Sequence, residues 1–171
     1  MGLRLGLLGG KELYYLIKVN HTHEMDATRY VLTKDYDPFI YQFISNGPRG
    51  DIKKIIQFQL IDLENNLYNL AFGDWNELTK QMDDLVVSNN HDKQKVLTTV
   101  AFAVKDFIEN YPNANIFAKG STHVRTRVYQ IGISLFLEEI SNYYRILGYV
   151  DDQWELFETG VNYESFLLSK K

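Results

Sequence analysis

The chain has 171 residues, of which 45% are hydrophobic and 23% charged, the balance of one ordinary globular domain. It contains no Cys, which excludes disulfides, thiolate zinc sites and cysteine nucleophiles and fits a cytoplasmic protein. The net charge of −4 argues against broad nucleic-acid binding, which depends on Lys and Arg that neutralise phosphates. The sequence has no run of about 18 apolar residues, so we expect no membrane span.

Residues 1–24 differ in character from the rest of the chain. Their apolar opening is short, and Lys11 and Glu12 follow it where an export signal would have small residues for cleavage. We therefore expect an N-terminal extension over residues 1–24 and a single domain over residues 25–171. His21 and His23 lie in the extension without carboxylate-rich support, so we predict no metal site and no cofactor.

Alternating apolar and polar residues then predict a series of strands. The strands are expected at 39–44, 52–61, 67–72 and 82–87, with turns at 45–50 and 64–66 and a loop at 73–79. In the second strand Ile56 and Phe58 should face one way, while Gln57 and Gln59 face the other. Short connections between these strands favour an antiparallel meander.

The period becomes helical after residues 88–90, which offer N-cap side chains, with Asp92 expected in the first turn. Pro112 should end this helix. Its apolar stripe comprises Val96, Leu97, Val100, Val104, Phe107, Ile108 and Tyr111.

A short buried strand is expected at 116–118, and a second helix should begin after Ser121 or Thr122 and continue to about Asn142. Gly132 is expected to weaken that helix near its middle. Its apolar residues at heptad-like spacing are Val124, Val128, Ile131 and Leu135. Closing strands are expected at 143–150, 154–157 and 163–168. This order predicts an α+β fold: a mainly antiparallel sheet with two helices packed on one face.

The strongest local signal for chemistry is the turn between the 116–118 strand and the second helix. A glycine turn that leads directly into a helix directs unpaired N–H groups and the positive end of the helix dipole to one spot. The predicted anion or phosphate site comprises Lys119, Gly120, Ser121, Thr122, Arg125 and Arg127. The alternative is a plain N-cap with the arginines on a solvated helix face.

Other polar groups are weaker candidates. Asp83 and Asp84 are neighbours in a predicted strand and point to opposite faces, so they do not converge on one ion. They remain open as structural or acid–base groups, and Asn89 or Asn90 could support them. His123 and the basic turn at residues 47–50 are further minor candidates.

Three blocks of sequence resemble an uncharacterised family of short bacterial proteins, mostly from Bacteroidota. They are YNLAFGDW at 68–75, DDLVVSNN at 83–90 leading into KVLTTVA at 95–101, and AKGST at 118–122 with RTRVY at 125–129. The resemblance extends roughly from Tyr30 to the C-terminus. It implies no activity, and it suggests that residues before Met25 are additional.

A looser similarity is to the N-acetyltransferase superfamily, in which a strand meander also precedes a helix, a strand and a helix. The second helix there often carries an Arg-x-x-Tyr-x-x-x-Gly run, which Arg125, Tyr129 and Gly132 match approximately. The pyrophosphate loop of that superfamily should lie between Val87 and Val96, where this chain has no Gly. The similarity implies kinship of fold, and the missing glycines argue against acyl-CoA chemistry.

Three functions follow from these patterns. The first is a binding domain, or an enzyme of unknown reaction, with a small phosphorylated ligand at 119–127. The second is an interaction module that acts as a homodimer through its Tyr-rich sheet or edge strands. The third is a degenerate N-acyltransferase.

Overall fold

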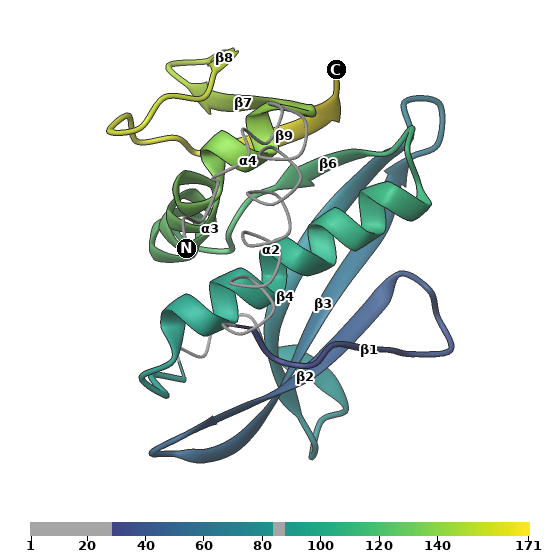
Figure 1. The fold of residues 1–171 in the computed structure, drawn as a ribbon, viewed down its shortest axis with the longest axis vertical. Coiled ribbons are helices and arrows are strands. Elements are labelled where there is room, and N and C mark those ends of the chain that lie inside the picture. The colour runs from purple at the N-terminus through teal and green to yellow at the C-terminus, as the bar shows by residue number, and fades with distance from the viewer. Residues whose placement is uncertain (1–28, 84–87) are drawn as a thin grey trace, which may run out of the picture.

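A sheet of nine strands runs through the part of the chain that the computed structural model describes, residues 29–83 and 88–171 (Figure 1). Its strands are β1 (Thr33–Lys34), β2 (Ile40–Gly47), β3 (Gly50–Asp62), β4 (Leu67–Asn76), β5 (Gln81–Asp83), β6 (Asn115–Ala118), β7 (Tyr144–Val150), β8 (Gln153–Leu156) and β9 (Ser165–Lys170). They lie in the order β1-β2-β3-β4-β6-β9-β7-β8, and β5 pairs with β4. Among the described strands, β4 and β6 alone pair in parallel, so the predicted mainly antiparallel sheet is confirmed. The proposed 1–24 extension and Asp84 lie outside the described residues.

The predicted meander is present, with one correction at β4. Ile56 and Phe58 are buried while Gln59 is exposed, as the alternation in β3 requires. Residues 73–76, expected in a loop, instead extend β4, and residues 74–76 pair with β5. Gly73 makes this possible, because a Cβ there would lie 2.6 Å from the backbone oxygen of Asp83. The glycine therefore marks a close approach of two strands.

Three helices lie between the strands of the described ranges: α2 (Lys93–Asn110), α3 (His123–Leu135) and α4 (Leu137–Ser141). The predicted second helix, expected to run unbroken to Asn142, is divided at Phe136, whose backbone leaves the helical region. Gly132 is not the point of division. A Cβ there would lie 3.5 Å from the Leu97 side chain, so this glycine lies where α3 contacts α2.

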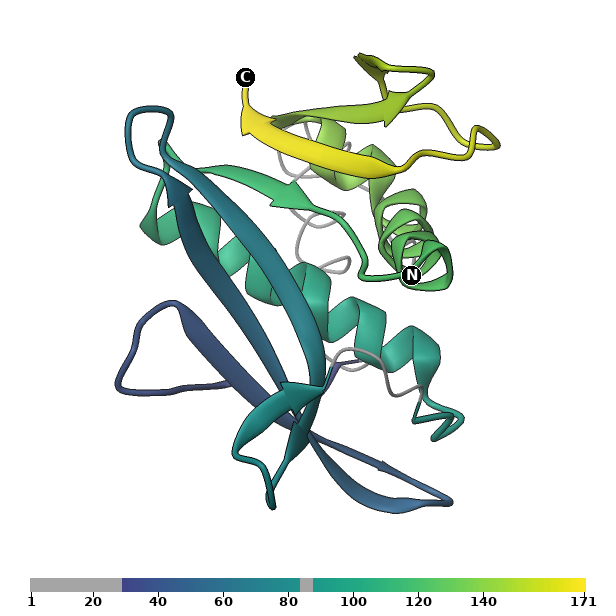
Figure 2. The ribbon, with the colours of Figure 1, turned by 180° about the vertical axis from the view of Figure 1, so that it is seen from behind.

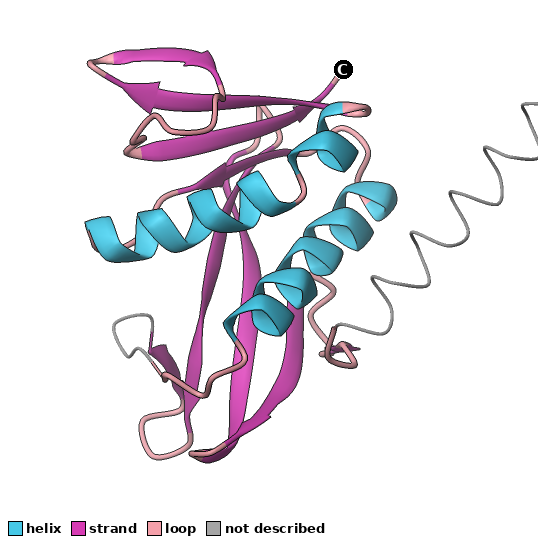
Figure 3. Cartoon of the chain, turned by 60° about the vertical axis from the view of Figure 1, so that its left-hand side comes forward, coloured by secondary structure: helices cyan, strands magenta, loops and turns pink. Residues whose placement is uncertain are grey.

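The long helices α2 and α3 both cover the same face of the sheet, as predicted (Figures 2 and 3). Connections that cross between parallel strands of one sheet are almost always right-handed, and this rule explains why both helices lie on one face. Helix α2 links the parallel neighbours β4 and β6, and α3 with α4 links β6 to β7 across the intervening β9. Both crossovers progress in one direction along the sheet, so their shared handedness places the helices on one side. No helix within the described ranges is both long and apolar enough to cross a bilayer.

The core lies between α2 and strands β2 to β4. The Phe107 ring of α2 stacks on Phe58 of β3 with centroids 3.9 Å apart, and both side chains are fully buried. Helix α3 is different, because its buried residues are Thr126 and Gln130. Val124 is 66% exposed and Leu135 is 49% exposed. Val124 and Leu135 of α3 therefore face outward, while Tyr129 and Ile133 pack against the core.

Candidate functional site

The turn between β6 and α3 folds back onto its own helix. Gly120 N–H donates to Thr126 Oγ1 at 3.1 Å, and a Cβ on Gly120 would lie 2.2 Å from the Thr126 nitrogen. Thr122 is the N-cap, and its hydroxyl accepts from Arg125 N–H at 3.3 Å. The missing side chain at Gly120 thus serves the packing of the turn against the first helical turn.

The two predicted arginines point in different directions. Arg125 reaches toward the sheet and donates to the Phe72 carbonyl at 3.3 Å, whereas Arg127 lies at the surface and donates to Asn162 Oδ1 at 2.5 Å. Positions two apart on a helix are about 200° apart around its axis, so both cannot contact one small anion. Lys119 and Ser121 are exposed beside the turn. The structure brings Gly120, Thr122 and the start of α3 together, and it separates Arg125 from Arg127.

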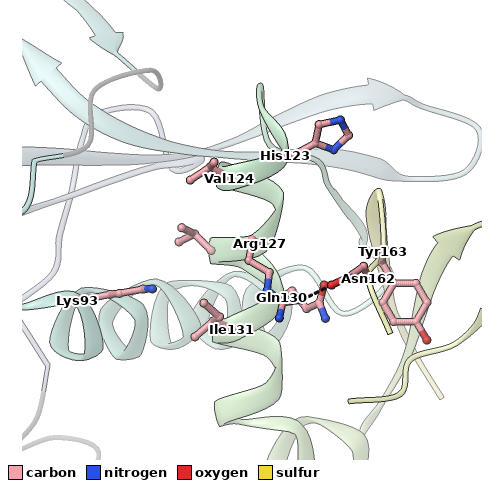
Figure 4. Close-up of a pocket in the computed structure, with 9 residues that line it drawn as sticks. Lys93, His123, Val124, Arg127, Gln130, Ile131, Asn162 and Tyr163 are labelled. Carbon is pink, nitrogen blue, oxygen red and sulfur yellow. Dashed lines mark hydrogen bonds between the residues drawn. The ribbon is translucent and has the colours of Figure 1, made fainter. Parts of the chain in front are cut away.

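An open pocket of about 420 Å³ lies along the outer side of α3 (Figure 4). Its lining residues are Lys93, His123, Val124, Arg127, Val128, Gln130, Ile131, Asn162 and Tyr163. They come from the start of α2, from residues 123–131 of α3, and from the 157–164 loop before β9. In Figure 4 the Lys93 side chain extends from α2 toward Ile131, and Arg127 lies beside Gln130 and Asn162. Sequence reasoning named only Arg127 and His123 among the polar residues of this pocket.

The charges around the pocket are of one sign. Lys93 and Arg127 are permanent cations, and none of the nine lining residues is acidic. Within the described ranges Lys93 makes no ion pair, and Arg127 has the neutral Asn162 amide as its hydrogen-bond partner. Val124, Val128 and Ile131 supply an apolar wall between these cations. The pocket therefore combines positive charge with an aliphatic surface.

The far wall of the pocket is held by buried polar groups. Gln130 is 5% exposed, and its Nε2 donates to the Val161 carbonyl at 2.5 Å. The Tyr163 ring packs directly on Gly148, where a Cβ would lie 2.2 Å from a ring carbon. The Tyr163 hydroxyl donates to Glu155 at 3.0 Å and accepts from the Glu158 N–H. Burial, aided by Glu155, raises the pKa of Tyr163, so the phenol stays protonated in this role.

Asn90, a predicted supporting residue, belongs to a structural network away from the pocket. Its Nδ2 donates to Ser45 Oγ and to the Gly50 carbonyl, and its Oδ1 accepts from Arg49 N–H. Asp92 is the N-cap residue of α2, not a first-turn residue, and its carboxylate accepts from Ser45 Oγ at 2.5 Å. These bonds tie the β2–β3 turn to the start of α2. Asn89 is exposed.

A second polar cluster, of which the sequence analysis named only Asp83, lies on the helix-covered face of β3 and β4. Lys54 forms an ion pair with Asp74, and its side chain is 6% exposed. It also donates to Ser88 Oγ at 2.7 Å. Asp83 lies opposite Asp74 in the β4–β5 ladder, so the two side chains share this face. One feature of the sequence could have indicated this cluster. Lys54 is two residues before Ile56 and four before Phe58, so the alternation of the strand places its side chain on their face.

Side chains of α3 donate hydrogen bonds to the middle of β4, between the residues that pair with β6 and those that pair with β5. β6 pairs with β4 over residues 67–69, and β5 pairs with it over 74–76. In the interval Tyr129 Oη donates to the Leu70 carbonyl at 3.3 Å, and Arg125 bonds the Phe72 carbonyl. Helix α3 thus supplies donors to carbonyls in the stretch of β4 that pairs with neither β5 nor β6 in the described part of the chain.

Residues 26–171 match one family, a family of unknown function designated DUF6934. No curated protein matches the chain, and no solved structure matches it either. The matched segment includes every element of the sheet and the whole candidate pocket. The chain therefore belongs to the family of unknown function DUF6934.

Proposed function

We propose that this domain binds a small anionic ligand that carries an aliphatic part, in the pocket along α3. One observation carries the proposal: Lys93 and Arg127 line the same pocket as three aliphatic side chains, without an acidic residue among its lining. The anion is a carboxylate or a phosphate. The predicted anion site covered residues 119–127; this proposal retains Arg127 from it and places the ligand along α3, beside Lys93 and the aliphatic side chains.

Simple electrostatics supports this location over the turn. Arg127 now bonds a neutral amide, and a hydrogen bond between Arg and a carboxylate or phosphate is roughly twice as strong. Lys93 has no competing carboxylate in the described part of the chain. The pocket is open, so added salt should weaken the ligand measurably.

Isothermal titration with 4-methylpentanoate, inorganic phosphate and a panel of nucleotides tests the proposal. Removing a charged hydrogen-bond donor costs about 1.5–3 kcal/mol, so Arg127→Met should weaken the ligand about 10- to 100-fold. Lys119→Met is the matched control, because Lys119 is exposed beside the turn and does not line the pocket. If Lys119→Met loses binding while Arg127→Met keeps it, the anion binds at the 119–122 turn and not in the pocket. Absence of binding by every probe would refute the proposal.

Kinship of fold with N-acetyltransferases is a second proposal, supported by the strand order and by the parallel β4–β6 pair. An acyl-CoA arm lying in the gap beside β4 would need the Leu70 and Phe72 carbonyls, which Tyr129 and Arg125 occupy. We therefore propose a relative of that fold without acyl transfer, located in the cytoplasm. Micromolar binding of acetyl-CoA would contradict this.

A homodimer through the β8 edge is the third candidate. Trp154 and Leu156 of this edge strand are 42% and 65% exposed, and an unprotected apolar edge favours pairing with another strand. Light scattering at high protein concentration decides it, since a strictly monomeric mass would exclude the dimer.

A further inference from the structure

The buried amide of Gln130 narrows the class of ligand that the pocket accepts. This inference rests on the function proposed above. Gln130 lies three residues after Arg127 on α3, and residues with this spacing are neighbours on one helix face, with Cβ atoms about 5–6 Å apart. Both side chains line the pocket. A ligand anchored by its anion at Arg127 therefore places its next atoms beside Gln130.

The orientation of the Gln130 amide follows from its partner. The Val161 carbonyl can only accept a hydrogen bond, so the amide group that faces it is the NH₂. This fixes Oε1 on the other side of the amide. No donor in the described part of the chain reaches Oε1, although Gln130 is 5% exposed. Oε1 keeps contact with solvent at the pocket that Gln130 lines, so a donor of a bound ligand can reach it and replace water there.

We infer that the ligand carries a neutral N–H or O–H donor one or two atoms from its anionic group, and that Gln130 Oε1 accepts from it. The aliphatic part then lies against Val124, Val128 and Ile131. The class is a 2-hydroxy acid or an N-acyl amino acid with a branched aliphatic side chain. A free amino acid fits less well, because its ammonium group would enter a pocket that already holds Lys93 and Arg127.

Matched ligands test this on the unmodified full chain. Isothermal titration would compare 4-methylpentanoate, 2-hydroxy-4-methylpentanoate and leucine, which differ at one position. One added neutral hydrogen bond should make the hydroxy acid bind roughly three- to tenfold tighter than 4-methylpentanoate. Leucine should bind more weakly than the hydroxy acid.

Gln130→Met supplies the second arm, because methionine keeps the volume and removes the acceptor. The ratio of the two affinities should fall to about one in this variant, and this ratio is the readout because loss of the bond to the Val161 carbonyl affects both acids alike. Equal affinities of the two acids for the native chain would overturn the inference and leave the proposed function standing. If Gln130→Met does not fold, the comparison on the native chain decides alone. Binding of neither acid would overturn the inference, and it would overturn the proposed function as well if phosphate and the nucleotides also fail to bind. Tighter binding of leucine than of the hydroxy acid would overturn the inference that the ligand's donor is neutral.

Discussion

Replacing Lys54 by Met should destabilise the domain by about 3 kcal/mol, because it leaves Asp74 without its cation in a largely buried position. The two side chains are 6% and 13% exposed. Removing one partner of a buried ion pair costs about 3–5 kcal/mol, and the small exposure of Asp74 favours the lower end. Lys54→Met also removes the donor to Ser88 Oγ. In a domain of this length the loss corresponds to a fall in Tm of about 6–12 °C.

Urea unfolding followed by circular dichroism would measure the cost. The double variant Lys54→Met/Asp74→Asn should be more stable than Lys54→Met alone by at least about 1 kcal/mol, since it also removes the stranded charge. Lys80→Met is the control: its ion pair with Glu77 is 2.7 Å long but 70% and 63% exposed, so its loss should leave the urea midpoint nearly unchanged. The single variant Asp74→Asn completes the comparison. If the costs of Lys54→Met and Asp74→Asn simply add up in the double variant, the two residues do not form a coupled buried pair.

Three further substitutions test separate parts of the structure. Gly120→Ala should lower Tm by several degrees, because its Cβ would meet the Thr126 nitrogen at 2.2 Å; an unchanged melting curve would contradict the packed turn. Asn90→Ala should cost about 2–4 kcal/mol in urea unfolding, since it removes three hydrogen bonds shorter than 3.2 Å at a buried site, and a cost below 1 kcal/mol would refute that role. Burial opposes ionisation of Asp106, but hydrogen bonds from Lys34 and Tyr41 outweigh it and hold its pKa below the ordinary value. Its contribution is therefore present above about pH 4 and is lost as pH falls through the lowered pKa, so Asp106→Asn should destabilise at pH 7 and have little effect near pH 2.

The sheet was predictable because its signals are local. Period-two alternation located β2 and β3, and the turn residues at 45–50 placed their hairpin. The extension of β4 over 73–76 was missed, because a glycine that admits a neighbouring strand has the same sequence signature as a loop glycine. The break at Phe136 was also missed, since nothing in its side chain disfavours a helix.

The candidate site was only partly predictable, because its residues are distant in sequence. Arg127 was identified, and its separation from Arg125 follows from helix geometry. Which of the two arginines turns toward the sheet depends on how α3 is oriented on it. Lys93 reaches the pocket from the start of another helix, and Asn162 reaches it from a loop. These residues meet only because of the way α2 and α3 pack against each other. That packing is not encoded in any short stretch of the sequence.

The most direct test of the central claim is a ¹H–¹⁵N spectrum of the labelled chain titrated with 4-methylpentanoate. The account predicts saturable shifts at Lys93, Arg127, Gln130 and Asn162, with small changes at Lys119 and Ser121. Saturable shifts confined to the 119–122 turn, or no shifts with this acid and none with phosphate, would contradict it.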